Sequence, residues 1–221
     1  AQAQRAVADG AAATGELRSD LRIGVIPTLS SIDVAALAAR FVAGNPKAGL
    51  VVTGGGSDRL VDLLLHDHLD VAFVGLPDHK TPPGIGLHRL GENRHVAAVP
   101  AAHILSTRSQ LHLAELADEQ FIDFPPGTPG RQQSDLAFSA AGLRRSVPYV
   151  VSVVEVMLDL VSRGVGIALL PPATVERRAD VTAVALIDGP RRVEAMAYRD
   201  FNPSPAAAVF RELLTQTPTD E

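Results

Sequence analysis

Apolar runs of strand length alternate with helical patterns through the first third of the chain, and this alternation restricts the fold more than any other feature. Helical segments carry apolar residues three and four positions apart, whereas the strand-like runs are short and almost wholly apolar. A β-α-β-α-β order of this kind requires a parallel sheet with right-handed crossover connections. The expected elements are a strand at 21–26, a helix at 30–43, a strand at 50–53, a helix at 57–66 and a strand at 70–75.

The second half of the chain repeats this plan, so we expect two similar α/β lobes. Thr128 can cap the first helix of this half, with Pro129 at its first position and Gly142 at its end. Ser204, followed by Pro205, opens the final helix. The expected strands of this half are 121–124, 149–152, 166–170, 181–187 and 193–199.

Local patterns predict where several of these elements begin and end. Ser30-x-x-Asp33 and Ser152-x-x-Glu155 resemble capping boxes at helix starts. The segment 44–46, Gly-Asn-Pro, predicts a left-handed helix end. Between the two halves, strands at 85–90 and 94–99 are expected on either side of a turn at Gly91, Glu92 and Asn93.

The expected domain organisation follows from these elements. Lobe I comprises 21–99 and 190–216, and lobe II comprises 100–189, with crossings near Pro100 and near Gly189 and Pro190. Two crossings leave a hinge that can open and close. We expect residues 1–20 to be the end of a linker, which makes the chain a fragment of a longer protein, and residues 217–221 to form a polar tail.

Composition excludes several classes of function. The chain has no cysteine, which rules out disulfides, thiolate metal sites, iron–sulfur clusters and a cysteine nucleophile. Its net charge of −5 argues against direct gripping of nucleic acid. No apolar run approaches the roughly 20 residues of a membrane span.

Three polar turns between a strand and a helix mark the candidate binding site. In a parallel sheet the carboxyl ends of strands and the helix N-termini beside them favour anionic ligands. A hydroxyl at such a turn either caps its own helix or binds a ligand; we favour capping for Ser57 and Ser152 and leave both roles open for Thr28, Ser30 and Thr128. Arg131 either pairs with an anion or faces solvent, and the latter is favoured.

Catalytic and metal motifs are missing from the sequence. The run Gly54-Gly55-Gly56 lacks the lysine of a phosphate-binding loop. His66 and His68 are two positions apart, so on a helix they point in different directions and do not share a metal ion. No hydrolase motif or paired acid and base stands out. We therefore expect no catalytic residue, no bound metal and no cofactor.

The order and spacing of these elements resemble the effector-binding domain of LysR-type transcriptional regulators over residues 21 to about 216. The segments that carry the resemblance are LRIGVIPTLSSIDVAALAARFVAGNP, GGGSDRLVDLLLHDHLDVAFVG, RHVAAVPAAHIL, LAELADEQFIDFPPGTPGR and VEVMLDLVSRGVGIALLP. The resemblance implies a periplasmic-binding-protein type 2-like α/β fold, with two Rossmann-like lobes and a ligand cleft between them. It also implies that a winged helix-turn-helix, missing here, makes the DNA contacts.

The resemblance assigns roles to specific residues. Family members bind ligand with the equivalents of Thr28, Ser30, Thr128 and Gly75. The full set of expected ligand-binding residues is Thr28, Ser30, Ser31, Gly55, Ser57, Gly75, Thr128 and Arg131. Family members also pair as antiparallel dimers, and alanine-rich helix 31–43 has apolar surface to spare for packing on helix 130–141 of a second copy. The expected interface residues are Val34, Ala35, Ala36, Ala39, Leu136 and Phe138.

We therefore expect a cytoplasmic, non-enzymatic effector-sensing and oligomerisation domain that binds a small anionic or polar metabolite. It would form a homodimer, with a tetramer allowed for the full-length protein, and would reach DNA only through the missing part. The alternatives are an extracytoplasmic solute-binding protein of the same fold and an enzyme on this fold. A solute-binding protein usually begins its first strand near the mature terminus or after a lipidated cysteine, and the enzyme lacks catalytic residues.

Overall fold

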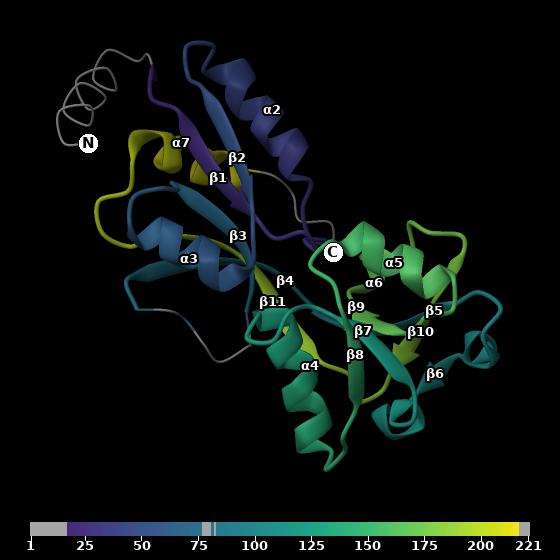
Figure 1. Cartoon of the computed structure of the whole chain (residues 1–221). Helices are drawn as coiled ribbons and strands as arrows, with labels where there is room; N and C mark the ends of the chain where they lie inside the picture. The colour runs from purple at the N-terminus through teal and green to yellow at the C-terminus, as the bar shows by residue number, and fades with distance from the viewer. Residues whose placement is uncertain (1–16, 77–80, 82, 217–221) are drawn as a thin grey trace. The chain divides into compact units, whose positions relative to one another are not determined.

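The chain forms two compact units (Figure 1). The computed structural model describes residues 17–76, 81 and 83–216, so the expectations for residues 1–16 and 217–221 lie outside the described part. Unit 1 contains the described residues up to Val74, those that end at Leu90 and those from Ala195 onward. Unit 2 contains Gly91–Glu194 and the end of the third strand from Gly75.

Unit 1 is built on a five-stranded sheet in the order β2-β1-β3-β11-β4. β1 is parallel to both neighbours, with Ile23 opposite Val52 on β2 and opposite Val71 on β3. This pairing confirms the expected parallel β-α-β-α-β start. The strands are β1 (Leu21–Val25), β2 (Leu50–Gly54), β3 (Val71–Leu76), β4 (Ile85–Arg94) and β11 (Arg191–Arg199).

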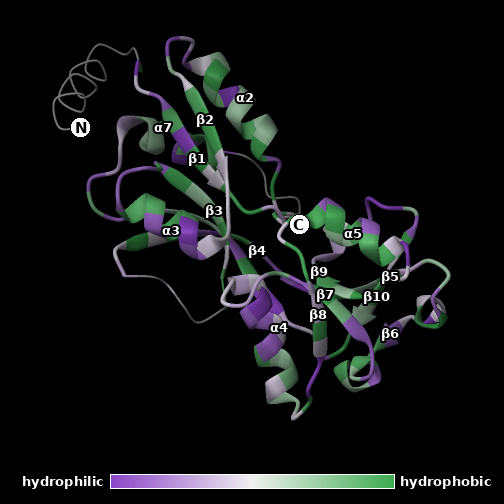
Figure 2. Cartoon of the chain, in the orientation of Figure 1, coloured by the Kyte–Doolittle hydropathy of each residue, from purple (hydrophilic) through white to green (hydrophobic). Residues whose placement is uncertain are grey.

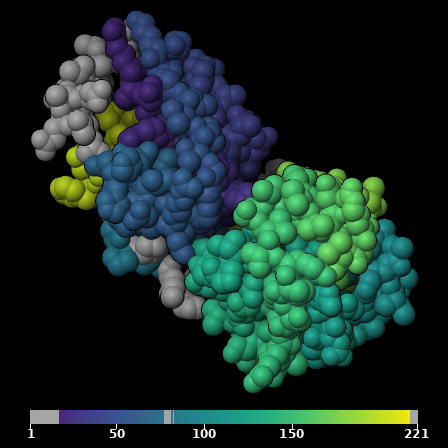
Figure 3. Space-filling view, viewed as in Figure 1, coloured from purple at the N-terminus to yellow at the C-terminus, as the bar shows by residue number. Residues whose placement is uncertain are grey.

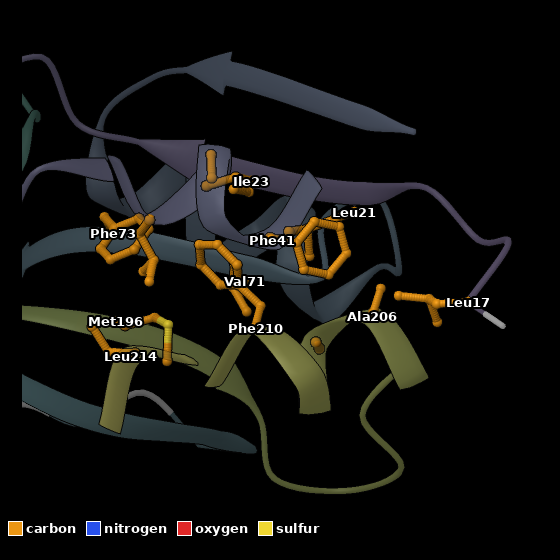
Figure 4. Close-up of a cluster of buried hydrophobic side chains, with 13 residues drawn as sticks. Leu17, Leu21, Ile23, Phe41, Val71, Phe73, Met196, Ala206, Phe210 and Leu214 are labelled. Carbon is orange, nitrogen blue, oxygen red and sulfur yellow. The ribbon is translucent and has the colours of Figure 1, made fainter. Parts of the chain in front are cut away.

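Three helices cover the sheet of unit 1: α2 (Val34–Gly44), α3 (Ser57–Leu65) and α7 (Pro205–Thr215). α2 and α7 share one face, where Phe210 meets Phe41 and Phe73 edge-to-face at ring-centroid distances of 6.0 and 6.3 Å (Figure 4). α3 packs on the opposite face, so closely that a Cβ on Gly24 would lie 2.9 Å from Leu60 Cδ2. Both faces of β3 are therefore covered, which explains its unbroken apolar run (Figure 2).

Unit 2 contains a four-stranded sheet in the order β6-β10-β5-β9, which a parallel bridge between Phe121 and Ile167 connects to the parallel pair β7-β8. β5 is antiparallel to both β9 and β10. The strands are β5 (Val96–Pro100), β6 (Gln110–Leu111), β7 (Gln120–Asp123), β8 (Ser146–Val150), β9 (Ala168–Leu170) and β10 (Val181–Leu186).

Two hydrophobic clusters fill unit 2. One packs α5 and α6 on the sheet around Met157 and Val161, and the other packs α4 around Phe121 and Phe138, whose rings meet edge-to-face at 5.4 Å. The helices are α4 (Pro129–Ala140), α5 (Val154–Ser162) and α6 (Pro172–Val175), with 3-10 turns η1 (Ile104–Thr107) and η2 (Leu113–Leu116). Unit 2 thus contains both strands and helices, as expected for the second half of the chain.

Three predictions about the connections between the two halves were wrong. No turn interrupts residues 91–93, because β4 runs unbroken to Arg94 beside β11 in the sheet. The boundary expected near Pro100 falls instead between Leu90 and Gly91, since β5 pairs with β9 and β10 of unit 2. The return boundary falls between Glu194 and Ala195 rather than near Pro190.

Several helix ends also differ from the prediction. Asp33, not Ser30, caps α2, and its Oδ1 accepts the Ala36 N–H at 2.9 Å. α2 ends through Asn45 at a φ of −136°, so the expected left-handed end is absent there. Val153, not Ser152, precedes α5, without a side-chain cap. The Ser204 cap of α7 is confirmed by a 3.1 Å bond from the Ala207 N–H.

Phe210 is expected to contribute most to the stability of unit 1, because it is fully buried between two aromatic rings. Phe210→Ala should lower the free energy of unfolding by about 3–5 kcal/mol in denaturant titrations. Phe201→Ala is the matched control, since this side chain is 87% exposed, and should change it by less than about 0.5 kcal/mol. Equal effects of the two substitutions would contradict this description of the core.

Candidate functional site

The carboxyl ends of β1, β2 and β3 lie at one edge of the unit 1 sheet, because β1 is parallel to both neighbours. Backbone bonds continue this alignment into the turns: the Ile26 N–H donates to Phe73 O and the Gly55 N–H to Val25 O, both at 3.2 Å. The turn that carries Thr28 and the one that carries Gly55 therefore begin side by side. Gly75 lies two residues beyond Phe73 on β3 and reaches the same edge.

The hydroxyl residues of this edge occupy loops and the first helical position, not helix caps. Thr28 and Ser57 are buried, and Ser30 and Ser31 are half-buried. Gly56, not Ser57, precedes α3, so the expected capping role of Ser57 was wrong. Because α2 starts at Val34, Ser30 and Ser31 belong to the loop before it.

Carboxylates already lie at the starts of two helices of unit 1, α2 and α3. Asp33 caps α2, and Asp58 lies in the first turn of α3. An acidic side chain at a helix N-terminus satisfies free N–H groups and the positive end of the helix dipole. The groups that this edge offers for hydrogen bonding are therefore loop N–H groups and hydroxyls more than the starts of α2 and α3.

In unit 2, Thr128 precedes α4 as predicted, but its hydroxyl serves the loop. The hydroxyl donates to Pro125 O at 2.8 Å, and Gly127 between them adopts a φ of +86° that suits glycine. The Thr128 carbonyl accepts the Gln132 N–H at 2.9 Å. The Thr128 hydroxyl oxygen can still accept a hydrogen bond while it donates to Pro125, since a hydroxyl has two lone pairs.

Arg131 belongs to an ion-pair network inside unit 2. Its Nε donates to Asp135 Oδ2 at 2.9 Å and lies 3.8 Å from Asp123 Oδ2. The side chain is only 16% exposed. The expectation that Arg131 faces solvent was therefore wrong, and its charge is already balanced by two carboxylates.

Arg145 is the centre of this network. Its Nη2 lies 2.6 Å from Asp123 Oδ2 and 2.7 Å from Asp135 Oδ1, and only 3% of its side chain is exposed. Its guanidinium also stands 5.3 and 5.5 Å from the ring centroids of Phe121 and Phe138. This cation stacks on two aromatic rings while it pairs with two carboxylates.

Asp123 ends β7 and fixes the start of the loop that leads to Thr128. Burial raises the pKa of Asp123, although the charges of Arg145 and Arg131 oppose that rise. Its Oδ1 accepts the N–H of Phe124 at 2.7 Å. Asp123 could have been noticed in the sequence, because it is the one charged residue inside the apolar run at 121–124. Its partner Arg145 lies 22 positions further along the chain, and no sequence pattern connects the two residues.

The residues expected at a dimer interface are divided between surface and core. Ala35, Ala36 and Ala39 are exposed on α2, and Val34 is half-buried. The segment that forms α2 lies at the surface of unit 1 in the space-filling view (Figure 3). Leu136 is 63% exposed on α4. Phe138 is 2% exposed and packs on Phe121, so its expected place in an interface was wrong.

Metal clusters and membrane-spanning helices are both absent from the part of the chain that the structure describes. There, no three His, Asp or Glu side chains gather in the manner of a metal site. Nor does this part contain a helix with the length and hydrophobicity that crossing a bilayer requires.

Residues 14–218 match the family model described as the LysR substrate binding domain. The chain belongs to this family. A curated relative, the probable hydrogen peroxide-inducible genes activator of Mycobacterium avium, is 26% identical over 81% of this chain and 57% of its own length. The chain spans about half the length of the first curated relatives it matches.

Solved structures show the same fold. The effector-binding domain of QuiR in complex with shikimate superposes with a TM-score of 0.77 at 20% identity, covering 88% of this chain and 94% of that one. Full-length CbnR complexed with its target DNA gives a TM-score of 0.73 at 22% identity and covers 97% and 76%. The α/β fold of the periplasmic-binding-protein type 2 class predicted from the sequence is thereby confirmed.

Arg145 is expected to be essential for the stability of unit 2. Arg145→Met leaves Asp123 buried beside an apolar side chain, so the free energy of unfolding should fall by about 3–5 kcal/mol in denaturant titrations. Arg144→Met is the matched control. The Arg144 side chain is exposed, so its replacement should change the free energy of unfolding by less than about 0.5 kcal/mol. A stability loss that is the same for both variants would show that the ion-pair network is unimportant.

Proposed function

We propose that this chain is the effector-sensing and oligomerisation domain of a LysR-type transcriptional regulator and binds a small polar metabolite. The observation that carries this proposal is the convergence of the Thr28 turn, the Gly55 turn and Gly75 at one edge of the unit 1 sheet. Ligands of open α/β sheets bind at the carboxyl ends of the strands. Family membership supports the same assignment.

The chemistry of the proposed site favours a ligand with hydroxyl or carboxylate oxygens. Loop N–H groups and hydroxyls offer neutral hydrogen bonds, and the charge of Arg131 is already balanced by Asp135 and Asp123. A compact carboxylate rich in hydroxyls, of the kind bound by QuiR, fits such a surface. The proposed contact residues are Thr28, Ser30, Ser31, Gly55, Ser57, Gly75, Thr128 and Arg131. That one ligand is held by residues of both units stays a prediction.

We propose further that DNA is bound by a part of the protein outside this chain. The net charge of −5 gives the chain no electrostatic attraction for phosphates, and its matches cover only about half of the relatives' length. A role in gene regulation also implies a cytoplasmic location and a binding, rather than catalytic, site. The names of the relatives as regulators support this proposal.

The proposed site is tested by ligand-dependent stabilisation. Among small carboxylates, with shikimate as the first probe, a ligand should raise the melting temperature in proportion to the logarithm of its concentration. Thr28→Val and Thr128→Val should each weaken its affinity about tenfold, as expected for one lost hydrogen bond of about 1.4 kcal/mol. Thr182→Val, on β10, should leave the affinity unchanged. Wild-type affinity in both site variants would refute the assignment.

We also propose that α2 packs on α4 of a second copy in a two-fold dimer. The outer face of α2 is small and apolar, with Ala36 and Ala39 exposed. Beside it in the sequence, edge strand β2 exposes Val51 and Val52 by 46% and 55%. Apolar surface on an edge strand is usually covered in native proteins. Leu136 on α4 supplies a matching apolar side chain.

A charge on the outer face of α2 should separate this dimer. Ala36→Glu is expected to yield monomers by light scattering at concentrations where the wild type is dimeric, with an unchanged circular dichroism spectrum. Ala208→Glu, at an exposed alanine of α7, should remain dimeric. A wild-type chain that stays monomeric at about 100 μM would rule out an interface of standard size.

A further inference from the structure

A buried polar cluster in unit 2 has no part in the proposed binding site. His95 stands between β4 and β5 and is 3% exposed, and Arg192 and Glu194 on β11 are 5% and 0% exposed. Arg192 and Glu194 form an ion pair. The Asn93 side-chain amide donates to Glu194 Oε1 at 3.1 Å. The cluster therefore ties β4 to β11 through side chains.

This cluster lies on the two segments by which the chain passes between its units. The passages fall between Leu90 and Gly91 on β4 and between Glu194 and Ala195 on β11. A backbone bond from the His95 N–H to Pro190 O, at 2.9 Å, joins the same two segments. Residues 91–95 and 189–194 are thus joined by this backbone bond, by the bond from Asn93 to Glu194 and by the ion pair of Glu92 with Arg191, where β4 pairs with β11 in the sheet.

His95 differs from the rest of the cluster in the hydrogen bonding of its side chain. Both of its ring nitrogens are buried, and neither makes a hydrogen bond. A neutral imidazole carries one donor and one acceptor, so burying both without partners is unfavourable. Separation of the two segments would expose both nitrogens to water.

The charges around His95 oppose its protonation in the buried state. Burial and the positive charge of Arg192 lower the pKa of His95 to about 3, and Glu194 opposes this only in part. Arg192 and Glu194 are the charged groups that act on it from β11. On β4, the Nη1 of Arg94 lies 3.5 Å from Leu186 O, and Glu92 pairs with Arg191.

We propose that His95 makes the connecting segments responsive to pH: uptake of a proton by its ring favours a conformation in which residues 91–95 and 189–194 separate and water reaches the ring. A cation beside Arg192 in a dry interior is unfavourable, whereas a hydrated imidazolium is not. The closed conformation would then prevail near neutral pH. This inference does not depend on the identity of any effector.

The direction and size of the effect follow from linkage. A base whose pKa is lowered in the closed form stabilises that form fully above about pH 6.5, its ordinary value, and loses this contribution as the pH falls toward 3. Each pH unit below about 6.5 favours the hydrated conformation about tenfold. Between pH 7.5 and pH 5.0 the ratio of hydrated to closed molecules should rise about 30-fold.

Hydrogen exchange followed by mass spectrometry tests the proposal without a ligand. After correction for intrinsic rates, opening of peptides that contain 91–95 and 189–194 should increase about 30-fold from pH 7.5 to pH 5.0. Peptides from α7 should not change in parallel. His95→Leu should abolish this pH dependence, because the leucine side chain does not titrate. His103→Gln should retain it, since His103 is half-buried elsewhere in unit 2, 3.8 Å from Glu119.

Wild-type exchange that is the same at both pH values, or a full pH response in His95→Leu, would overturn the proposal. If His95→Leu does not fold, nuclear magnetic resonance titration of the His95 ring in the wild type decides instead. The ring should then stay mostly neutral to a pH well below 6.5, while exchange in the two segments accelerates as the pH falls below about 6.5. A ring that titrates near pH 6.5 while exchange stays constant would also overturn the proposal.

Discussion

The parallel pairing of β1 with β2 and β3 is the constraint on which the proposed function depends. Its register places the ends of the three strands at one edge, and backbone bonds from Ile26 and Gly55 carry that alignment into the turns. Short polar turns separated by more than twenty residues in the chain thereby become neighbours. The buried aromatic contacts of Phe210 hold α7 against this sheet.

Charge in this protein is balanced locally. Asp33 and Asp58 occupy the starts of α2 and α3, and the network around Arg145 neutralises Arg131. A ligand at the edge of unit 1 would therefore meet hydroxyls and loop N–H groups more than unbalanced charge. Neutral hydrogen bonds of this kind discriminate by the geometry of the ligand's oxygens, which suits a domain that must distinguish one small metabolite from others.

Local patterns predicted most strands and helices correctly, because apolar periodicity reports directly on burial. Long-range partners could not be predicted. β4 continues through Gly91 because it pairs with β11, which lies about a hundred residues further along the chain. Arg145 is buried because it pairs with Asp123 and packs on the rings of Phe121 and Phe138. The capping-box prediction at Ser30 was wrong because α2 begins three residues later than expected, after Asp33. The candidate residues Thr28 and Gly55 could be placed at one sheet edge from the sequence, since strand ends and turn chemistry are local features.

The most direct test of this account is the mapping of backbone amide chemical shifts while small carboxylates, beginning with shikimate, are titrated into the domain. A bound ligand should change the amide chemical shifts of residues 28–31, 54–57 and 75, with smaller changes at 126–131. Shifts confined to other parts of the sheets, with these amides unmoved by any ligand that binds, would contradict the central claim that the strand ends of unit 1 form the effector site.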